Sequence, residues 1–261
     1  MRLKLTLSVL ALISVSLAHP CRNWSPWNCK TECWKYESKC WNYGPKYWNW
    51  GPEYRRWGPG RWNWEQRRGF FYFLQNYPKQ NLSQEEIKGL LHMREEEKLA
   101  RDVYLTLYNK WKLPIFLNIA RSEQRHMDAI KYLLEKYGLK DPIAKNEDKI
   151  GYFSNPEFQK LYKDLVNQGS KSLIDALKVG ALIEELDIKD LKDHISKTDN
   201  KDIAFVFQNL MKGSRNHLRA FVRVLYSFGG NYSPKYISQQ EFETIINSPM
   251  ERGPVGIRCL N

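Results

Sequence analysis

Residues of metal-ligand type recur in this 261-residue chain at spacings that would place them on the buried faces of helices. Glu123 and His126 are three residues apart, so on an α-helix their side chains lie on the same face. Carboxylates with imidazole favour iron or manganese, and zinc can occupy such a site without redox chemistry. The candidate metal ligands are Glu97, Glu123, His126, Glu184, Asp187 and His217.

Four predicted helices position these residues. Apolar side chains at spacings of three and four predict helices over about 84–110, 114–137, 171–196 and 200–228. In each helix the candidate ligands interrupt the middle of the apolar stripe. A long connection, 139–169, contains a short helix that follows Asn155-Pro156, and a last short helix begins at the capping box Ser238–Glu241.

Carboxylates inside a helical core need cations, protons or arginine partners, because an unpaired buried charge is costly. The four candidate carboxylates would neutralise two divalent ions, with His126 and His217 supplying nitrogen ligands. The pattern therefore predicts a dinuclear iron or manganese site. A buried polar network without metal, and a register shift that exchanges Glu97 for Glu96, are the alternatives. The arginines that could pair with the buried acids are Arg101, Arg215 and Arg219.

Other charged residues are expected to lie at the surface. The charge runs Glu95-Glu96 and Asp190–Asp193 predict solvated helix faces, and His92 is expected to be peripheral. A net charge of +12 and a mean hydropathy of −0.63 exclude a multi-pass membrane protein. The sequence has no Gly-rich phosphate-binding loop, and it has no serine, histidine and aspartate in the order of a catalytic triad. Hydrolase and nucleotide-binding functions therefore have no support.

Four segments resemble an uncharacterised, mainly microbial family of ferritin-like domains that is related in form to rubrerythrin and bacterioferritin. The segments are EEEKLARDVY (95–104), NIARSEQRHMDAI (118–130), ALKVGALIEELDIKDL (176–191) and NLMKGSRNHLRAF (209–221). The resemblance covers about 83–247. It implies an all-α fold, a ferritin-like four-helix bundle with a long crossover that contains a short helix.

The resemblance also implies roles for residues of the first two helices. In those relatives the first metal-binding Glu is followed by Ala at +3 and Tyr at +7, and Glu97, Ala100 and Tyr104 match this pattern. Glu123 and His126 match the first Glu-x-x-His motif. Tyr104 is therefore expected beside the metal ligands.

The last two helices match the family less completely. Glu184 matches the third-helix ligand, with Glu185 as the alternative, and His217 matches the last histidine. Ser214 stands where the second Glu-x-x-His motif would place its Glu. Asp187, one turn after Glu184, is our candidate for the missing carboxylate.

The chain begins with a segment typical of a secretory signal peptide. Residues 1–18 have Arg2 and Lys4 before an apolar run that ends in a small-x-small pattern, which predicts cleavage before His19 and a secreted, extracellular protein. No membrane span is expected after cleavage. The sequons that permit N-glycosylation in a eukaryotic host are at Asn23, Asn81 and Asn231.

Secretion favours disulfides among the five cysteines. These are Cys21, Cys29, Cys33, Cys40 and Cys259. Their pairing cannot be read from the sequence, and the odd number leaves one thiol free or paired with a second chain, so a homodimer is left open. A zinc site made of the four clustered cysteines is the alternative, although their spacing lacks the paired short loops of zinc ribbons.

A basic, tryptophan-rich arm, 19–70, precedes the helical domain, 83–247, which a tail, 248–261, follows. Nine of the ten tryptophans lie between Trp24 and Trp64, and a seven-residue W-N-x-G-P unit repeats there. The Gly-Pro pairs exclude helix. Aromatic faces beside Lys and Arg suit a glycan or an anionic matrix polymer, and packing against the helical domain is the alternative. Nucleic acid is not expected for a secreted protein.

Two functions of different classes are compatible with these features. In the first, the protein is a dimetal oxidoreductase that oxidises Fe(II) or reduces peroxide or O2. In the second, it is a non-catalytic extracellular protein that binds matrix or glycan through the tryptophan-rich arm, with the helices as a support.

Overall fold

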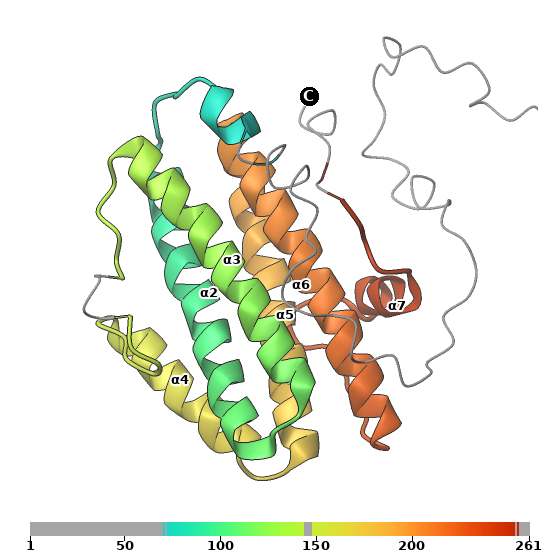
Figure 1. Ribbon diagram of the computed structural model, residues 1–261. Coiled ribbons are helices and arrows are strands. Elements are labelled where there is room, and N and C mark those ends of the chain that lie inside the picture. Colours follow the sequence, from blue (N-terminus) through green and yellow to red (C-terminus); the bar gives the residue numbers. More distant parts are fainter. Residues whose placement is uncertain (1–69, 71, 144–147, 254, 256–261) are drawn as a thin grey trace, which may run out of the picture. The chain divides into compact units, whose positions relative to one another are not determined.

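The described part of the chain is helical. The computed structural model describes residues 70, 72–143, 148–253 and 255 (Figure 1). The helices are α2 (Gln84–Trp111), α3 (Pro114–Tyr137), α4 (Pro156–Gly169), α5 (Leu173–Ile195), α6 (Lys201–Ser227) and α7 (Gln239–Asn247). This confirms the all-α class and the predicted helices, whose ends agree to within about two residues.

Local signals set the helix ends. At the start of α2 the Ser83 hydroxyl accepts a hydrogen bond from the Glu86 backbone N–H, and the Glu86 carboxylate accepts one from the Ser83 N–H. This is the predicted capping box, which satisfies two donors that a helix start leaves without partners. The end of α3 is set by Gly138 at φ 72, a left-handed conformation that favours glycine.

The four long helices lie side by side (Figure 1). α2 packs along α3, and α5 packs along α6, while α2 also contacts α5 and α3 contacts α6. α4, in the long connection, lies against α2 and α5, and α7 lies against α6. α2 is therefore covered by three other helices, which explains why buried residues occur around most of its circumference.

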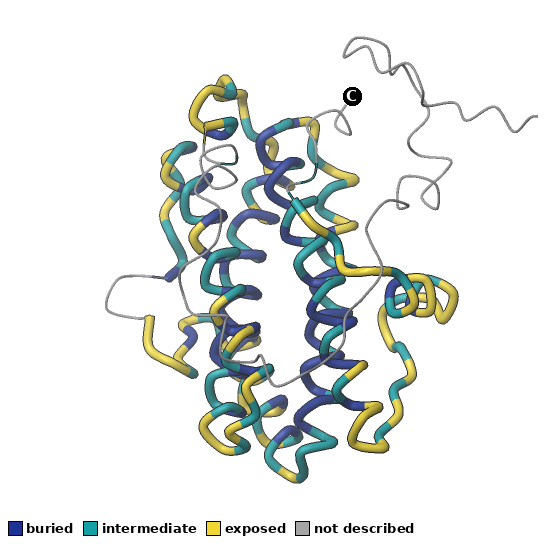
Figure 2. Tube along the Cα trace, turned by 45° about the vertical axis from the view of Figure 1, so that its right-hand side comes forward, coloured by how far each residue is buried: buried dark blue, intermediate teal, exposed yellow. Residues whose placement is uncertain are grey.

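The buried residues of the long helices form two apolar clusters. One cluster contains Tyr104, Phe116 and Phe221, and the other contains Leu90, Leu133 and Phe207. On α2, α3 and α6, acidic residues or a histidine lie where one cluster gives way to the other, and on α5 Glu184 and Asp187 lie just before this change. Figure 2 shows the buried positions gathered on the inward sides of the helices. The candidate ligands thus form a polar layer inside an apolar core.

Burial corrects the expectation that the charge run Glu95-Glu96 is a solvated face. Glu96 is buried, with 2% of its surface exposed, and Asp190 is partly buried. The sequence was misleading here because α2 is covered on several sides, so an acidic residue that points away from α3 meets α5 instead of water.

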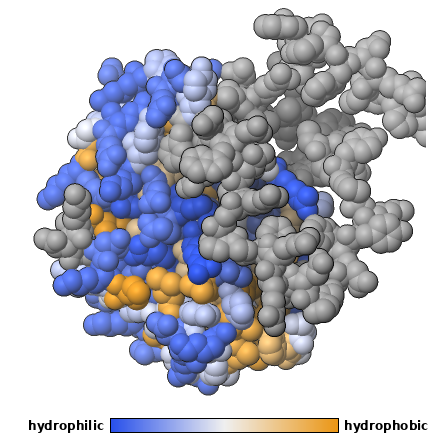
Figure 3. Space-filling view, viewed as in Figure 1, coloured by the Kyte–Doolittle hydropathy of each residue, from blue (hydrophilic) through white to orange (hydrophobic). Residues whose placement is uncertain are grey.

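The visible described surface in Figure 3 is mostly hydrophilic, with hydrophobic residues gathered near its lower end. None of the described helices is long and apolar enough to cross a membrane.

Several predicted features lie outside the described residues. These include the signal peptide, nearly all of the arm 19–70, and the glycosylation candidate Asn23. The five cysteines also fall there, namely Cys21, Cys29, Cys33, Cys40 and Cys259. The other two sequon asparagines, Asn81 and Asn231, are described and exposed.

Candidate metal centre

The polar layer brings together five of the six candidate ligands in two overlapping groups. The first group is Glu97, Glu123 and His126, and the second is Glu123, Glu184 and His217. Within each group the ligand atoms lie within 4.8 Å of one another. α2, α3, α5 and α6 all contribute, and Glu123 belongs to both groups. We call these five residues the metal centre.

Glu123 lies between the two histidines. Its Oε2 is 2.7 Å from His126 Nδ1, and its Oε1 is 2.8 Å from His217 Nδ1. The two imidazole rings stack, with centroids 5.6 Å apart. If two ions were bound, Glu123 would be the residue able to serve as a ligand to both.

The outer carboxylates complete the two groups. His126 Nδ1 is 3.1 Å from Glu97 Oε2, and His217 Nδ1 is 3.2 Å from Glu184 Oε2. Two ligands held about 2.1 Å from one ion and at right angles would lie about 3.0 Å apart. The observed separations are close to this value, and they are also the lengths of hydrogen bonds in the absence of metal.

Two carboxylates of the polar layer have oxygens without hydrogen-bond partners in the described part of the chain. Glu97 and Asp187 are fully buried, and neither Oε1 of Glu97 nor either oxygen of Asp187 has a hydrogen-bond partner among the described residues. A buried carboxylate without partners is costly. Among the described residues, the ion pairs of Glu97, Glu123 and Glu184 are all with the two histidines. The donor set fits iron or manganese.

The three arginines that could pair with the buried acids form ion pairs with carboxylates outside the metal centre. Arg101 pairs with Asp102 and Asp148, and Arg215 and Arg219 both pair with Glu251. The pairs with Asp148 and Glu251 tie non-helical segments to α2 and α6, and none of the three arginines pairs with a carboxylate of the metal centre among the described residues.

Tyr104 and Glu184 are joined by a hydrogen bond. The Tyr104 hydroxyl donates to Glu184 Oε1 at 2.7 Å, and Tyr104 is fully buried. Tyr104 thus lies beside Glu184, one of the candidate ligands. Because the other oxygen of Glu184 faces His217, the tyrosine fixes the rotation of this carboxylate.

The neighbouring candidates Glu185, Ser214 and Asp187 lie outside the two groups. Glu185 accepts hydrogen bonds from the Tyr232 hydroxyl and from the backbone N–H groups of 235–237, so it holds the segment before α7. The Ser214 hydroxyl donates to the Leu210 carbonyl of its own helix. Asp187 lies one turn after Glu184, and burial together with the charges of Glu96 and Glu97 holds its pKa well above the usual range.

Protons occupy the centre at neutral pH. Burial raises the pKa of Glu97 to about 8 and that of Glu184 to about 7. Burial alone would lower the pKa of His126, but the charges of Glu97 and Glu123 outweigh it and raise the pKa to about 9. Burial would likewise raise the pKa of Glu123, but His217 and His126 outweigh it and hold the pKa far below its usual range. Metal ions that bound here would therefore have to displace protons.

The metal-free protein is expected to lose stability as the pH rises from about 5 to about 9. Between pH 4.5 and about 8 the folded chain keeps a proton on Glu97 that the unfolded chain releases, and His126 acts in the same direction from pH 6.5 to about 9. Tm should fall over this range without metal, and added metal should raise Tm most at the high end. A metal-free Tm that rises with pH over this range would contradict the proton assignment.

Gly213 on α6 is a site residue that sequence reasoning missed. A Cβ atom at this position would lie 2.6 Å from both Cε1 and Nε2 of His126, so only glycine lets the imidazole reach its place. The signal in the sequence was a glycine inside an otherwise helical pattern, four residues before His217.

Gly213→Ala is expected to weaken metal binding although it removes no ligand. Helix propensity alone would stabilise the variant by about 0.5–1 kcal/mol, because glycine is unfavourable inside a helix. The clash would displace His126. We expect a roughly tenfold or greater loss of affinity for one of the two ions, because changes that disturb the orientation of a metal ligand have effects of this size. Metal titration measures the affinity, and unfolding of the metal-free variant measures stability. Unchanged affinity would show that the close approach is unimportant.

Three comparisons place the chain among known proteins. Residues 86–249 match the family described as an uncharacterized protein domain, DUF2202. The chain is 67% identical over 181 residues to the uncharacterized protein MJ0754 of Methanocaldococcus jannaschii, which covers 69% of this chain and 97% of the relative. The crystal structure of hypothetical protein MJ0754 resembles this one with a TM-score of 0.66 and 66% identity, covering 67% of this chain and 99% of that chain.

The region of similarity contains the whole metal centre, since Glu97 to His217 fall inside the match to the family. A match over more than half of the chain, together with so similar a relative, settles the assignment, and the chain belongs to the DUF2202 family.

Proposed function

We propose that this protein is a ferritin-like four-helix-bundle protein that holds two iron or manganese ions in its metal centre and acts as an oxidoreductase. The observation that carries the proposal is the position of Glu123, whose two oxygens face two different histidines at 2.7 and 2.8 Å. The reaction class is oxidation of Fe(II) or reduction of peroxide or O2. A pair of such ions supplies one-electron steps to an oxidant.

The charges of the ligands support a site that accepts a further anionic or neutral ligand. Three carboxylates, from Glu97, Glu123 and Glu184, do not neutralise two divalent ions, and Asp187 next to them brings a fourth negative charge when it is ionised. Each ion would have three protein ligands, which leaves coordination positions open to a small oxidant.

The surroundings of the centre control orientation and water. Tyr104 holds Glu184 in place, and the apolar clusters on both sides exclude water from the carboxylates. His126 and His217 are the most exposed members of the centre, with side chains 12% and 11% exposed. Access for a small oxidant is therefore favoured on the side of α3 and α6.

Metal analysis and turnover together test the proposal. The purified protein is loaded anaerobically with Fe(II) or Mn(II), its bound metal is measured by plasma mass spectrometry, and O2 and peroxide are then added while oxidation is followed spectroscopically. We expect two ions at the metal centre and oxidation faster than that of free Fe(II) at equal concentration.

Two results would overturn it. Bound metal without faster oxidation would leave a metal-binding protein that is not an oxidoreductase. No stoichiometric metal would make the polar layer structural and would direct attention to glycan or matrix binding by the tryptophan-rich arm.

A further inference from the structure

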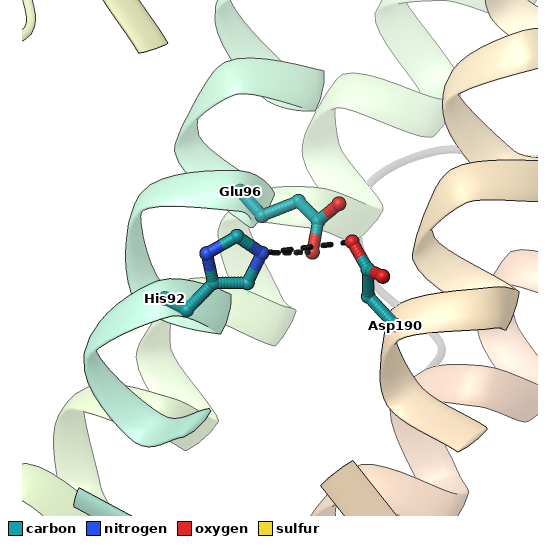
Figure 4. Close-up of side chains that lie close together, drawn as sticks. All are labelled: His92, Glu96 and Asp190. Carbon is teal, nitrogen blue, oxygen red and sulfur yellow. Dashed lines mark ion pairs between the residues drawn. The ribbon is translucent and has the colours of Figure 1, made fainter. Parts of the chain in front are cut away.

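A second cluster of ligand-type side chains lies outside the metal centre. His92 and Glu96 are one turn apart on α2, and Asp190 faces them from α5 (Figure 4). One ligand atom of each lies within 4.8 Å of the other two. We call this the outer cluster.

The separations in the outer cluster suit a metal ion better than hydrogen bonds. His92 Nε2 is 3.5 Å from Glu96 Oε2 and 3.6 Å from Asp190 Oδ2, both too long for a good hydrogen bond. Two ligands about 2.1 Å from an ion in tetrahedral geometry would lie about 3.4 Å apart. Both separations from the imidazole nitrogen are therefore close to those expected for ligands that share one ion.

Glu96 gives independent support for a bound cation. Only 2% of its surface is exposed, and its Oε2, the atom that faces His92, has no hydrogen-bond partner among the described residues. A buried oxygen without a partner is rare because its desolvation is not compensated. A cation between Glu96, His92 and Asp190 would supply the missing partner.

The other contacts in the cluster leave its ligand atoms available. Lys189 Nζ binds Asp190 Oδ1 at 2.6 Å and also pairs with Asp193, while Oδ2 of Asp190 points to His92. The His92 ring packs against the Phe158 ring of α4, with centroids 5.4 Å apart, which helps to fix its orientation. The His92 side chain is 42% exposed, so an ion there would be in contact with solvent.

We propose that His92, Glu96 and Asp190 form a third metal site, which binds one divalent cation such as Zn²⁺, Mn²⁺ or Fe²⁺ and cross-links α2 to α5. α2 packs mainly along α3, and α5 mainly along α6, so the ion would join the two helix pairs near the surface. One imidazole and two carboxylates suit this class of cation, and three protein ligands leave a position open to water. This site does not depend on the function proposed for the metal centre.

The test uses the full chain with the metal centre removed by Glu123→Ala. Zn²⁺ and Mn²⁺ are titrated into this variant by calorimetry, and we expect one ion per chain and a Tm rise of about 5 °C or more at a hundred times Kd. Adding His92→Ala or Asp190→Asn should abolish this ion. Adding Asp193→Asn, which removes the same charge from an exposed position on the same helix, should leave it bound.

The same comparison in the otherwise unchanged chain guards against a folding defect of Glu123→Ala. There, His92→Ala should lower the number of bound ions by one relative to the Asp193→Asn control. If neither background loses an ion, the outer cluster is only an ion pair of a protonated histidine, and the proposal fails. The unchanged chain could instead bind a single ion that His92→Ala removes. That result would support a metal site in the outer cluster, and it would overturn the function proposed above because the metal centre would bind no ion.

Discussion

Replacing Glu123 with alanine is expected to remove both ions of the metal centre, whereas replacing Glu97 is expected to remove one. Glu123 is the ligand that the two groups share, with one oxygen against His126 and the other against His217. Its loss would leave each ion with one carboxylate and one imidazole. Glu97 belongs to one group, so Glu97→Ala would leave Glu123, Glu184 and His217 in place.

Plasma mass spectrometry on protein loaded under identical conditions measures this difference. We expect a decrease of two ions per chain for Glu123→Ala and of one for Glu97→Ala, with oxidation of Fe(II) reduced to the rate of the free ion in the first variant. Glu135→Ala is the matched control, because Glu135 is an exposed carboxylate of the same helix, 67% exposed, far along α3 from the centre. Its metal content should equal that of the unchanged chain.

The folding of Glu123→Ala must be verified without metal. The alanine removes a buried charge from the polar layer but also takes the ion-pair partner from two histidines, so both far-UV circular dichroism and metal-free Tm are needed. Equal losses for Glu97→Ala and Glu123→Ala in folded proteins would show that Glu123 is not shared. Two retained ions in Glu123→Ala would show that the ions bind elsewhere.

The second large effect is expected at Asp102, where alanine should destabilise the protein by about 3–5 kcal/mol, the cost of leaving buried charges without their partner. Asp102 is fully buried and accepts hydrogen bonds from Lys98 Nζ at 2.5 Å, from the Arg101 guanidinium at 2.8 and 2.9 Å, and from the Gly151 N–H at 3.0 Å. Lys98 also donates to two backbone carbonyls of the segment 149–152. Asp102 thus joins α2 to the segment before α4.

Chemical and thermal unfolding of the metal-free protein measures the loss. A destabilisation of this size corresponds to a fall in Tm of roughly 6–20 °C for a domain of this length. The control is Asp164→Ala, which removes an exposed carboxylate that pairs with Lys160 one turn away on α4. A surface pair of this kind contributes at most about 1 kcal/mol. Equal effects for the two variants would refute the role of the buried network.

The helices, and the turns of each helix at which polar residues face inward, could be predicted from local patterns in the chain. Capping residues such as Ser83 and stop residues such as Gly138 act within one turn, and an apolar period of 3.6 residues fixes which face is buried. The pattern therefore predicts that Glu97, Glu123 and His217 lie on inward faces, whichever way the helices pack.

Which of the buried polar residues come into contact depends on how the helices pack. Glu184 and Glu185 are neighbours in the sequence and both are fully buried, yet Glu184 joins the metal centre and Glu185 binds the segment before α7. The sharing of Glu123, the burial of Glu96 and the buried network around Asp102 also escaped prediction. The physical reason is that helix caps and stripes arise from neighbours along the chain, whereas these contacts depend on how α4, α5 and α6 pack around α2 and α3.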